Sequence, residues 1–502
     1  MLHYGTAGFR AYHTLLDNVL YRCGILMAIR AKHYGTTGIM ITASHNAWAD
    51  NGVKLIDYNG EMIDVIWQEY ANELVNAPDD LCLQSVINSI KDRVAEAMDI
   101  EENPTSPKKT PCVIIGYDTR ESAQRLVKEC KDGVKSQDCL WKDVGMVTTP
   151  EMHYYVAGFP KHNICIKIDE GDDTMVTNKY TNYIMTKFVD IILDSTLPVC
   201  HVDCANGVAS LRMKELNIPS IKLYNTNVNI PELLNHACGS DFVEKSQTFP
   251  VSMEDIPEGE LCFSIDGDGD RVVCFMKKDG KFKLFNGDHI AILFASMMNK
   301  MDVKGLRKGI VQTAYANGAS TLYIKENLPD FEVVKAKTGV QNLHKKALSY
   351  DIGIYFEANG HGTILAKDFL FFPLCQYTGD AIANMLLIIR MKNEQHLLKT
   401  PFSLTNVTFE DFPSKHTKIQ LSRDIKKEDF VLNEDETRLL EPIFIQEGID
   451  AILASYPMDT TRAFLRPSGT EDILRLYVEA KEAGDVNAIT GQIIELLNLK
   501  YF

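Results

Sequence analysis

Four short apolar runs each stop at a turn rich in Gly, Asn or Asp. They are GIMITASHN at 38–46, PVCHVDCANG at 198–207, LCFSIDGDGD at 261–270 and IGIYFEANGHG at 352–362. A buried strand that ends in a polar loop produces this pattern, and helical periodicity follows some of the turns. The pattern therefore predicts α/β domains with functional loops at strand ends. The runs have no fixed spacing, so the chain is not a repeat protein.

The length of 502 residues favours three or four domains. The polar, proline-interrupted stretch at 399–413 is typical of a junction before a last domain, and weaker boundaries fall near 185–197 and 287–290. A helix capped by Asp288 should follow the second of these. The last domain should end with a strand at 473–480 and a helix at 487–500.

Composition restricts the partners of the chain. Lys and Arg total 52 against 68 Asp and Glu, and the net charge of -16 opposes general binding to nucleic acid or anionic membranes. The 12 cysteines include no Cys-x-x-Cys, and Cys200 and Cys204 lack matching histidines, so free thiols are expected. With no expected signal peptide or membrane span, we expect a reducing, cytoplasmic location.

Asp266, Asp268 and Asp270 alternate with glycines in DGDGDR, between two apolar runs. Three carboxylates on one tight turn require a cation, so this spacing predicts a metal site. An EF-hand loop would need Gly and Glu where this chain has Arg271 and Lys277. The ligands are hard oxygens, which favours Mg²⁺ over Zn²⁺. A solvated acidic turn is the alternative interpretation.

Ser44, Lys54 and Arg10 form a second group of candidates. Ser44 follows an apolar run in TASHN, where its hydroxyl could act as a nucleophile at a strand end. Lys54 could transfer a proton if positive neighbours lower the pKa of its amine, and Arg10 could hold a phosphate. Alone, each has an ordinary structural explanation, namely a turn serine, a surface lysine and a surface arginine.

Two later loops offer groups that recognise sugars and phosphates. In FEANGHG, Glu357, Asn359 and His361 supply donors and acceptors for sugar hydroxyls, although a polar hairpin turn is the simpler interpretation. In RPSGTED, a guanidinium, two hydroxyls and exposed backbone amides could surround a phosphate, with Arg475 as a second cation or as a surface partner of Glu479. The chain has no GxxxxGK sequence, so it lacks a Walker loop.

Together, TASHN, DGDGDR, FEANGHG and RPSGTED resemble the loops of the α-D-phosphohexomutases, in this order and over nearly the whole chain. The resemblance implies four domains around a central cleft: three α/β domains and a smaller C-terminal α+β domain. Each is expected to supply one loop to the active site. The expected domains, carrying the phosphoserine, metal, sugar and phosphate loops respectively, are 1–187, 188–288, 289–400 and 401–502.

The order of the loops points to one subgroup. GYDTR at 116–120 normally precedes the serine loop in this family, whereas here TASHN comes first. This order, together with CGSDFV at 238–243 and EANGHG, resembles the phosphoacetylglucosamine mutases and implies N-acetylglucosamine phosphate as substrate. There are two departures. Ala47 replaces the proline that usually follows Ser-His-Asn, which removes a restraint on Asn46, and the stretch between EANGHG and 378–382 is short.

The resemblance also implies a mechanism. An isomerase of this kind carries phosphate on Ser44 and exchanges it with the sugar through a hexosamine 1,6-bisphosphate, on the route to UDP-N-acetylglucosamine. Lys54 is the implied general base, Arg10 and Arg271 balance charge, and His361 assists the reverse proton transfer. The implied ligands of one Mg²⁺ are Ser44, as phosphoserine, with Asp266, Asp268 and Asp270. The implied substrate-binding residues are Arg271 and, on the sugar and phosphate loops, Glu357, Ala358, Asn359, Arg466, Pro467, Ser468, Gly469, Thr470 and Arg475.

Three other functions are open at this point. A phosphoglucomutase or phosphomannomutase would use the same chemistry on a different sugar. A metal-dependent phosphatase would pass the phosphoryl group to water, and an inactive phosphosugar sensor would bind ligand without forming phosphoserine. The expected partner is a small phosphosugar, without an obligate protein partner.

Overall fold

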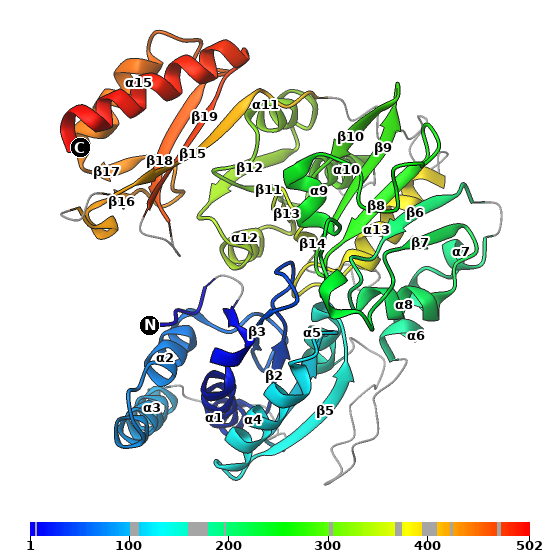
Figure 1. Cartoon of the computed structure of the whole chain (residues 1–502), viewed down its shortest axis with the longest axis vertical. Coiled ribbons are helices and arrows are strands. Elements are labelled where there is room, and N and C mark those ends of the chain that lie inside the picture. The colour runs from blue at the N-terminus through cyan, green and yellow to red at the C-terminus, as the bar shows by residue number, and fades with distance from the viewer. Residues whose placement is uncertain are drawn as a thin grey trace. The chain divides into compact units, whose positions relative to one another are not determined.

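The computed structural model describes residues 1–5, 8–100, 110–158, 179–194, 197–300, 305–366, 374–393, 409–421, 425–468 and 473–501 (Figure 1). The chain forms two compact units. The first comprises Met1–Asn286, Asn359–Thr363 and Phe369–Glu394, and the second comprises Gly287–Ala358, Ile364–Asp368 and Gln395–Phe502. Among the helices described, none is both long and apolar enough to cross a membrane.

The first sheet of unit 1 has the order β1-β3-β2-β4-β5. Its strands are β1 (Phe9–Tyr12), β2 (Thr36–Ile41), β3 (Asp50–Ile56), β4 (Cys112–Tyr117) and β5 (Leu140–Met146). Strands β2, β4 and β5 are parallel, whereas β3 is antiparallel to both its neighbours. The helices of this region are α1 (Asp17–Tyr34), α2 (Val65–Val75), α3 (Asp80–Ile100), α4 (Ala123–Lys135) and α5 (Thr149–Ala157). The run at 38–46 thus forms the end of β2 and the loop that carries Ser44.

The second sheet of unit 1 has the order β10-β9-β8-β6-β7. Its strands are β6 (Cys200–Asp203), β7 (Ile221–Tyr224), β8 (Leu261–Ile265), β9 (Val272–Lys278) and β10 (Lys281–Phe285). Strand β8 is parallel to β6 but antiparallel to β9, so residues 266–271 form a tight connection between two buried strands. The helices are α6 (Lys179–Lys187), α7 (Val189–Ile192), α8 (Ala209–Leu216), α9 (Ser240–Ser246) and α13 (Ala381–Asn393), and α13 packs against β9.

The third sheet has the order β12-β11-β13-β14. Its strands are β11 (Lys308–Thr313), β12 (Phe331–Ala336), β13 (Ile352–Phe356) and β14 (Gly362–Ala366), accompanied by α10 (Gly287–Lys300), α11 (Gly318–Asn327) and α12 (Val340–Ala347). Helix α10 confirms the helix expected near 288. Asp288 lies within its first turn instead of capping it, and its carboxylate accepts the N–H of Asn317 (3.0 Å).

The last sheet is antiparallel, with the order β15-β19-β18. Its strands are β15 (Ser414–Gln420), β18 (Arg462–Pro467) and β19 (Ile473–Glu479), next to a hairpin of β16 (Val431–Leu432) and β17 (Leu439–Glu441) and the helices α14 (Ile443–Leu453) and α15 (Ala483–Tyr501). Ile445, Leu465, Leu476 and Ile489 share one buried apolar core. Strand β19 and helix α15 confirm the elements expected at the end of the chain. The four domain boundaries remain predictions, and most of the expected junction at 399–413 lies outside the described residues.

Candidate active site

Ser44 lies just after β2 and is buried, with a left-handed backbone (φ 52°) that is unusual for serine. Its N–H donates to Thr42 Oγ1 (2.8 Å), and the Thr42 hydroxyl donates to Asp118 Oδ2 (2.7 Å). The Ser44 hydroxyl donates to Asp266 Oδ2 (2.6 Å). This contact joins residues 222 positions apart in sequence and places the candidate nucleophile beside the acidic turn.

Arg120 binds the serine loop through hydrogen bonds to its backbone. Its Nη2 donates to the carbonyl oxygens of Ser44 (3.1 Å) and Asn46 (2.9 Å), and its Nη1 donates to those of Ala47 (2.6 Å) and Asp50 (2.8 Å). Its Nε pairs with Asp118 (3.0 Å), so both side chains are fully buried yet neutralised. This residue was missed by the sequence analysis, which used GYDTR only to judge the order of the motifs.

Asn46 is restrained although Ala47 replaces the usual proline. Its Oδ1 accepts from Arg10 Nη1 (3.2 Å) and its Nδ2 donates to Asp50 Oδ2 (3.0 Å). Asn235 Nδ2 also donates to the carbonyl oxygens of Ser44 (2.8 Å) and Asn46 (3.0 Å). Hydrogen bonds thus supply the restraint that a proline ring would give.

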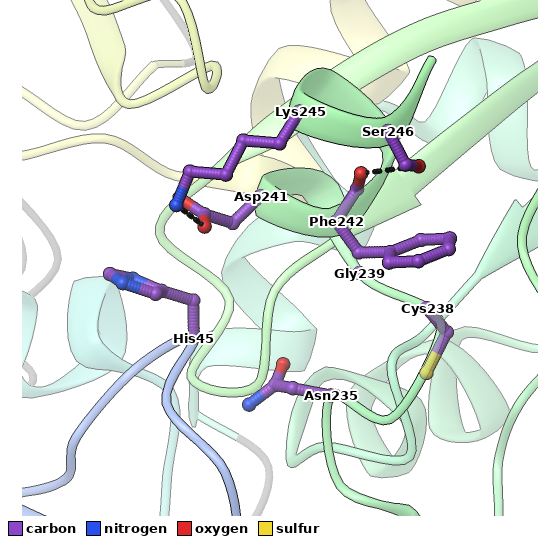
Figure 2. Close-up of a pocket in the computed structure, with 8 residues that line it drawn as sticks. All are labelled: His45, Asn235, Cys238, Gly239, Asp241, Phe242, Lys245 and Ser246. Carbon is purple, nitrogen blue, oxygen red and sulfur yellow. Dashed lines mark hydrogen bonds and ion pairs between the residues drawn. The ribbon is translucent and has the colours of Figure 1, made fainter. Parts of the chain in front are cut away.

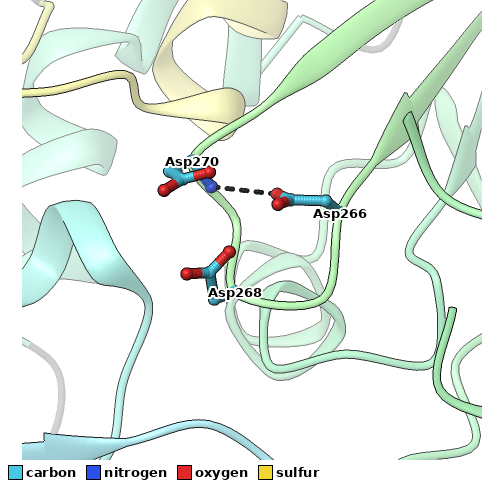
Figure 3. Close-up of side chains that lie close together, drawn as sticks. All are labelled: Asp266, Asp268 and Asp270. Carbon is cyan, nitrogen blue, oxygen red and sulfur yellow. Dashed lines mark hydrogen bonds between the residues drawn. The ribbon is translucent and has the colours of Figure 1, made fainter. Parts of the chain in front are cut away.

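Asp266, Asp268 and Asp270 form a cluster, shown in Figure 3, in which one carboxylate oxygen of each lies within 4.8 Å of the others. All three are fully buried. The backbone N–H of Asp270 and that of Arg271 both donate to Asp266 Oδ1 (3.1 Å each). Oδ1 of Asp268 and Oδ1 of Asp270 are buried without a donor among the described residues. Such orphaned hard oxygens suit a cation such as Mg²⁺.

Lys54 on β3 contacts two carboxylates of this cluster. Its Nζ bonds to Asp268 Oδ2 and Asp270 Oδ2 (2.6 Å each) and to Thr149 Oγ1 (3.3 Å). Burial alone would lower the pKa of Lys54, but Asp268 and Asp270 raise it above its ordinary value. Lys54 is therefore an ammonium ion in this arrangement. In Asp266, by contrast, burial and the charges of Asp268 and Asp270 raise the carboxyl pKa well above its ordinary value.

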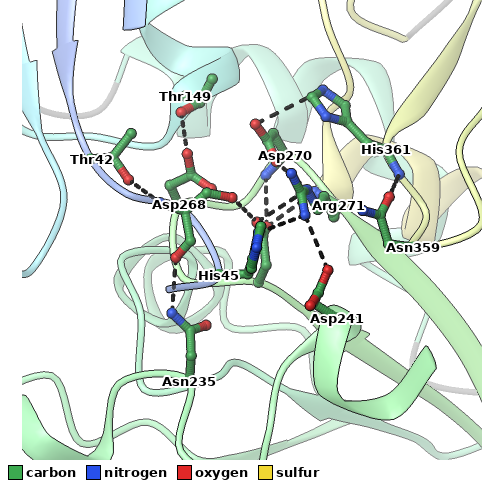
Figure 4. A network of polar contacts seen from close by, with 12 residues as sticks. Thr42, His45, Thr149, Asn235, Asp241, Asp268, Asp270, Arg271, Asn359 and His361 are labelled. Atoms are coloured by element: carbon green, nitrogen blue, oxygen red, sulfur yellow. Dashed lines mark hydrogen bonds and ion pairs between the residues drawn. The ribbon is translucent and has the colours of Figure 1, made fainter. Parts of the chain in front are cut away.

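Arg271 connects the acidic turn to His45 (Figure 4). Its Nη1 donates to His45 Nδ1 (2.7 Å) and lies 3.4 Å from Asp241, whereas its Nε is 3.5 Å from Asp270. Burial and the charge of Arg271 lower the pKa of His45 to about 2, so the imidazole is neutral with its proton on Nε2.

A pocket of about 350 Å³ lies beside His45. Figure 2 shows its lining side chains, with the imidazole on one side and the ion pair of Lys245 and Asp241 on another. The pocket is lined by His45, Asn235, Cys238, Gly239, Asp241, Phe242, Lys245 and Ser246.

Arg10, on β1, offers an unused guanidinium edge near the serine. Its Nε and Nη2 are buried and have no acceptor within the described part of the chain. Burial and the neighbouring charge of Arg271 lower its pKa to about 10, so it is still a cation at neutral pH. A buried cation with open donors is suited to bind an anion such as phosphate.

The FEANGHG loop connects β13 to β14. In unit 2, Glu357 is the first residue after β13, and the carbonyl oxygen of the next residue, Ala358, accepts the N–H of Gly287 (3.0 Å). In unit 1, His361 Nε2 lies 3.2 Å from Thr378 Oγ1 and 3.9 Å from Asp270 Oδ2. Burial lowers the pKa of His361 to about 4, so it is neutral at physiological pH. Asn359 Oδ1 accepts the N–H of His361 (3.3 Å).

The RPSGTED loop begins at the end of β18, in unit 2. Arg466 and Arg475 are directly opposed on β18 and β19. Pro467 is the last residue of β18, and the N–H of the buried Ser468 donates to the carbonyl oxygen of Ile473 (2.9 Å). The carboxylate of Glu479 pairs with Arg462 (3.0 Å). Gly469 and Thr470 lie outside the described residues.

Family models match in each part of the chain. Those described as phosphoacetylglucosamine mutase AMG1 cover residues 176–273 (domain II) and 286–371 (domain III). Phosphoglucomutase/phosphomannomutase models cover 21–76 and 91–168 (domain I) and 406–496 (C-terminal domain). The phosphoacetylglucosamine mutase of Sus scrofa is 34% identical over 98% of this chain and 93% of its own length. Phosphoacetylglucosamine mutase 1 of Schizosaccharomyces pombe is 36% identical over 96% of this chain and 96% of its own length.

The chain belongs to the phosphoacetylglucosamine mutase family. This confirms both the resemblance and the four-domain α/β fold class. The crystal structure of Aspergillus fumigatus N-acetylphosphoglucosamine mutase in complex with GlcNAc-6P and magnesium superposes with a TM-score of 0.84 and 32% identity, covering 99% of this chain and 95% of that one. A Burkholderia thailandensis phosphoglucomutase/phosphomannomutase family protein, at 16% identity over 77% of this chain and 89% of its own (TM-score 0.53), shares only the fold. The relatives of 34% and 36% identity over nearly the whole chain do not favour the phosphoglucomutase or phosphomannomutase alternative.

Proposed function

We propose that this chain interconverts N-acetylglucosamine 6-phosphate and N-acetylglucosamine 1-phosphate through a phosphoserine at Ser44. The observation that carries the proposal is the 2.6 Å hydrogen bond from Ser44 to Asp266, one of three clustered carboxylates, in a member of this family. A relative solved with GlcNAc-6P and magnesium, and another with glucose 1,6-bisphosphate, support the substrate and the intermediate. The free thiols among the described cysteines agree with the proposed reducing, cytoplasmic location.

The phosphoryl group moves in two transfers. A sugar hydroxyl oxygen bonds to phosphorus as the bond to Ser44 Oγ breaks, and the hydroxyl proton passes to Lys54, which yields a hexosamine 1,6-bisphosphate. After the bisphosphate turns round, Ser44 Oγ bonds to the phosphorus at the other position as the sugar O–P bond there breaks, and the released sugar oxygen takes its proton from Lys54. Lys54 can accept a proton only after it separates from Asp268 and Asp270 and releases its own proton to solvent, because their charges keep it protonated in the arrangement described here. His361 is neutral and can accept or donate a proton beside Asp270.

Asp266, Asp268 and Asp270, with an oxygen of the phosphorylated Ser44, would hold one Mg²⁺. When bound, the ion neutralises carboxylate charge and stabilises negative charge on the transferring phosphoryl group. Arg10 contributes two open guanidinium nitrogens to the same anion, and Arg271 lies within 3.7 Å of Asp266.

Removal of divalent cations is expected to lower mutase activity strongly, because the three buried carboxylates then repel an incoming phosphate. Dialysis against a chelator should reduce turnover by more than about 100-fold, as for loss of one main electrostatic stabiliser. Added Mg²⁺ should restore turnover, and added Ca²⁺, which tolerates longer and more flexible ligand geometry, should restore it poorly. Full activity of the chelated protein, with no metal left by elemental analysis, would contradict the assigned site.

The phosphate that is not transferred is proposed to bind the loop around Arg466. Arg466 and Arg475 are directly opposed on the neighbouring strands β18 and β19, and like charges in this position favour binding of an anion between them. Pro467 and Ser468 shape the start of the loop, and Gly469 and Thr470 complete the proposed set. The sugar hydroxyls are assigned to Glu357, Ala358 and Asn359, which follow β13.

Phosphorus NMR tests the proposed reaction directly. Purified protein, Mg²⁺ and N-acetylglucosamine 6-phosphate, with a trace of the 1,6-bisphosphate, are expected to produce the 1-phosphate signal. Isomerisation of glucose or mannose 6-phosphate alone would overturn the substrate assignment but keep the chemistry. Release of inorganic phosphate would indicate a phosphatase, and binding without any reaction would indicate a sensor.

A further inference from the structure

Arg466 is anchored through one of its nitrogens by two residues that the proposed function does not use. Its Nη1 donates to Thr338 Oγ1 (2.6 Å) and forms an ion pair with Glu436 Oε2 (3.1 Å). The same Glu436 oxygen accepts the backbone N–H of Thr338 (3.0 Å). Thr338 follows β12, whereas Glu436 lies between β16 and β17, so two distant segments of unit 2 converge on one guanidinium.

A second nitrogen of Arg466, Nε, is buried and left unsatisfied within the described part of the chain. The guanidinium carbon lies 5.7 Å from the centroid of the Tyr315 ring, so an aromatic side chain limits its position on another side. A guanidinium binds phosphate best through two neighbouring nitrogens, and anchoring Nη1 leaves the edge that includes Nε for such a contact.

The backbone at Glu436 shows that a carboxylate there has a cost. Glu436 has a left-handed conformation (φ 58°), where Gly or Asn is the usual residue. The turn is made by Asn433, whose Oδ1 accepts the N–H groups of Thr437 and Arg438 (3.0 Å each), and the turn does not need the Glu436 side chain. The Glu436 side chain is only 7% exposed, so burial of its charge adds to the cost. The ion pair with Arg466 offsets both.

We propose that Glu436, acting with Thr338, is a positioning residue that fixes Arg466 so that the edge that includes Nε meets the non-transferring phosphate of the substrate. This inference rests on the proposed function, since it takes Arg466 as part of the phosphate site. An arginine side chain loses much rotamer freedom when it binds a ligand. Glu436 imposes that ordering before the substrate arrives, so less affinity is lost on binding.

The test compares Glu436→Ala and Glu436→Gln with the wild type. Loss of one charge-assisted anchor is expected to raise KM for N-acetylglucosamine 6-phosphate, and its calorimetric Kd, by about tenfold. The kcat should change by less than about threefold, because Glu436 touches no reacting atom. Glu436→Gln should recover most of the affinity, since an amide oxygen still accepts from Arg466 Nη1. A merely structural role would lower kcat and the folded fraction without this split.

A double-mutant cycle assigns the effect to Arg466. Arg466→Ala should raise KM more than Glu436→Ala does, and adding Glu436→Ala to it should change nothing further. Asp450→Asn is the matched control, because Asp450 accepts from Arg438, two residues beyond Glu436, in an exposed ion pair. Its KM and kcat should equal those of the wild type.

Several results would overturn the inference. An unchanged KM and Kd in Glu436→Ala would do so while leaving the mutase activity of the wild type untouched. Additive effects of Glu436→Ala and Arg466→Ala would mean that Glu436 acts elsewhere. If Arg466→Ala has normal affinity, both the inference and the phosphate-site assignment fail. If the wild type lacks mutase activity but Glu436→Ala still weakens the calorimetric Kd, the proposed reaction fails and the positioning role stands.

Discussion

Ser44→Ala is expected to lower kcat by at least about a thousandfold, because the variant has no oxygen on which to carry the phosphoryl group. Phosphosugar affinity should change little, since the proposed phosphate and sugar groups lie on other loops. The fold should persist, because the change removes only the hydrogen bond from Ser44 Oγ to Asp266. Phosphorus NMR measures the turnover, calorimetry measures affinity, and intact-mass spectrometry shows whether a phosphorylated form is present.

Ser136→Ala is the matched control for this experiment. The Ser136 hydroxyl donates to the carbonyl oxygen of Gly133 at the end of α4, and no part of the proposed mechanism uses it. Its kcat and its phosphorylated fraction should equal those of the wild type. If Ser44→Ala kept more than about one per cent of wild-type kcat, far above what the residual site supplies without its nucleophile, the serine shuttle would be wrong.

The strand-end loops could be predicted because apolar runs and turn residues encode them locally. β2, β6, β8 and β13 each end where the corresponding run stops, and this places Ser44 and Asp266 at the ends of buried strands. The acidic turn was also clear from sequence, since three aspartates separated by glycines leave few alternatives. Local patterns of this kind survive folding because tertiary packing reinforces them.

The contacts between distant segments could not be predicted. Sequence spacing does not show that Lys54 pairs with Asp268 and Asp270, because the pairing depends on how the β3 and β8–β9 segments meet. The sequence also predicted that Asp288 caps a helix. Instead, Asp288 lies inside the first turn of α10 and accepts the N–H of Asn317. For the same reason, the sequence did not predict that Glu436 anchors Arg466. The two residues are 30 positions apart, one in the turn between β16 and β17 and the other on β18.

Arg120→Met is expected to destabilise the first unit by about 3–5 kcal/mol, because it leaves the buried Asp118 without its partner. It also removes the N–H groups that donate to four carbonyl oxygens of the serine loop, those of Ser44, Asn46, Ala47 and Asp50. Urea unfolding measures the loss of stability. Hydrogen exchange should show faster opening of residues 42–50, and kcat should fall because Ser44 is no longer held beside Asp266.

The loss of stability in Arg120→Met, relative to the wild type, should increase with pH. Burial raises the pKa of Asp118, and Arg120 is the main charge that opposes this rise. Without Arg120 the folded protein keeps a proton on Asp118 that the unfolded chain releases above its ordinary pKa of about 3.9. Stability then falls as the pH rises through the window between the unfolded and the folded pKa, because the folded state binds more protons there.

Arg120→Lys separates the effect of the Arg120 charge from that of its hydrogen bonds to the serine loop, and Arg93→Met is the control. Arg120→Lys keeps a cation for Asp118 but cannot reach four carbonyl oxygens, so it should recover much of the stability and little of the activity. Arg93→Met removes an exposed ion pair with Glu73 and should change stability by less than about 1 kcal/mol. If Arg120→Met unfolded at the urea concentration of Arg93→Met and kept full activity, the serine loop would owe its shape to Asn235, Arg10 and its own turn instead.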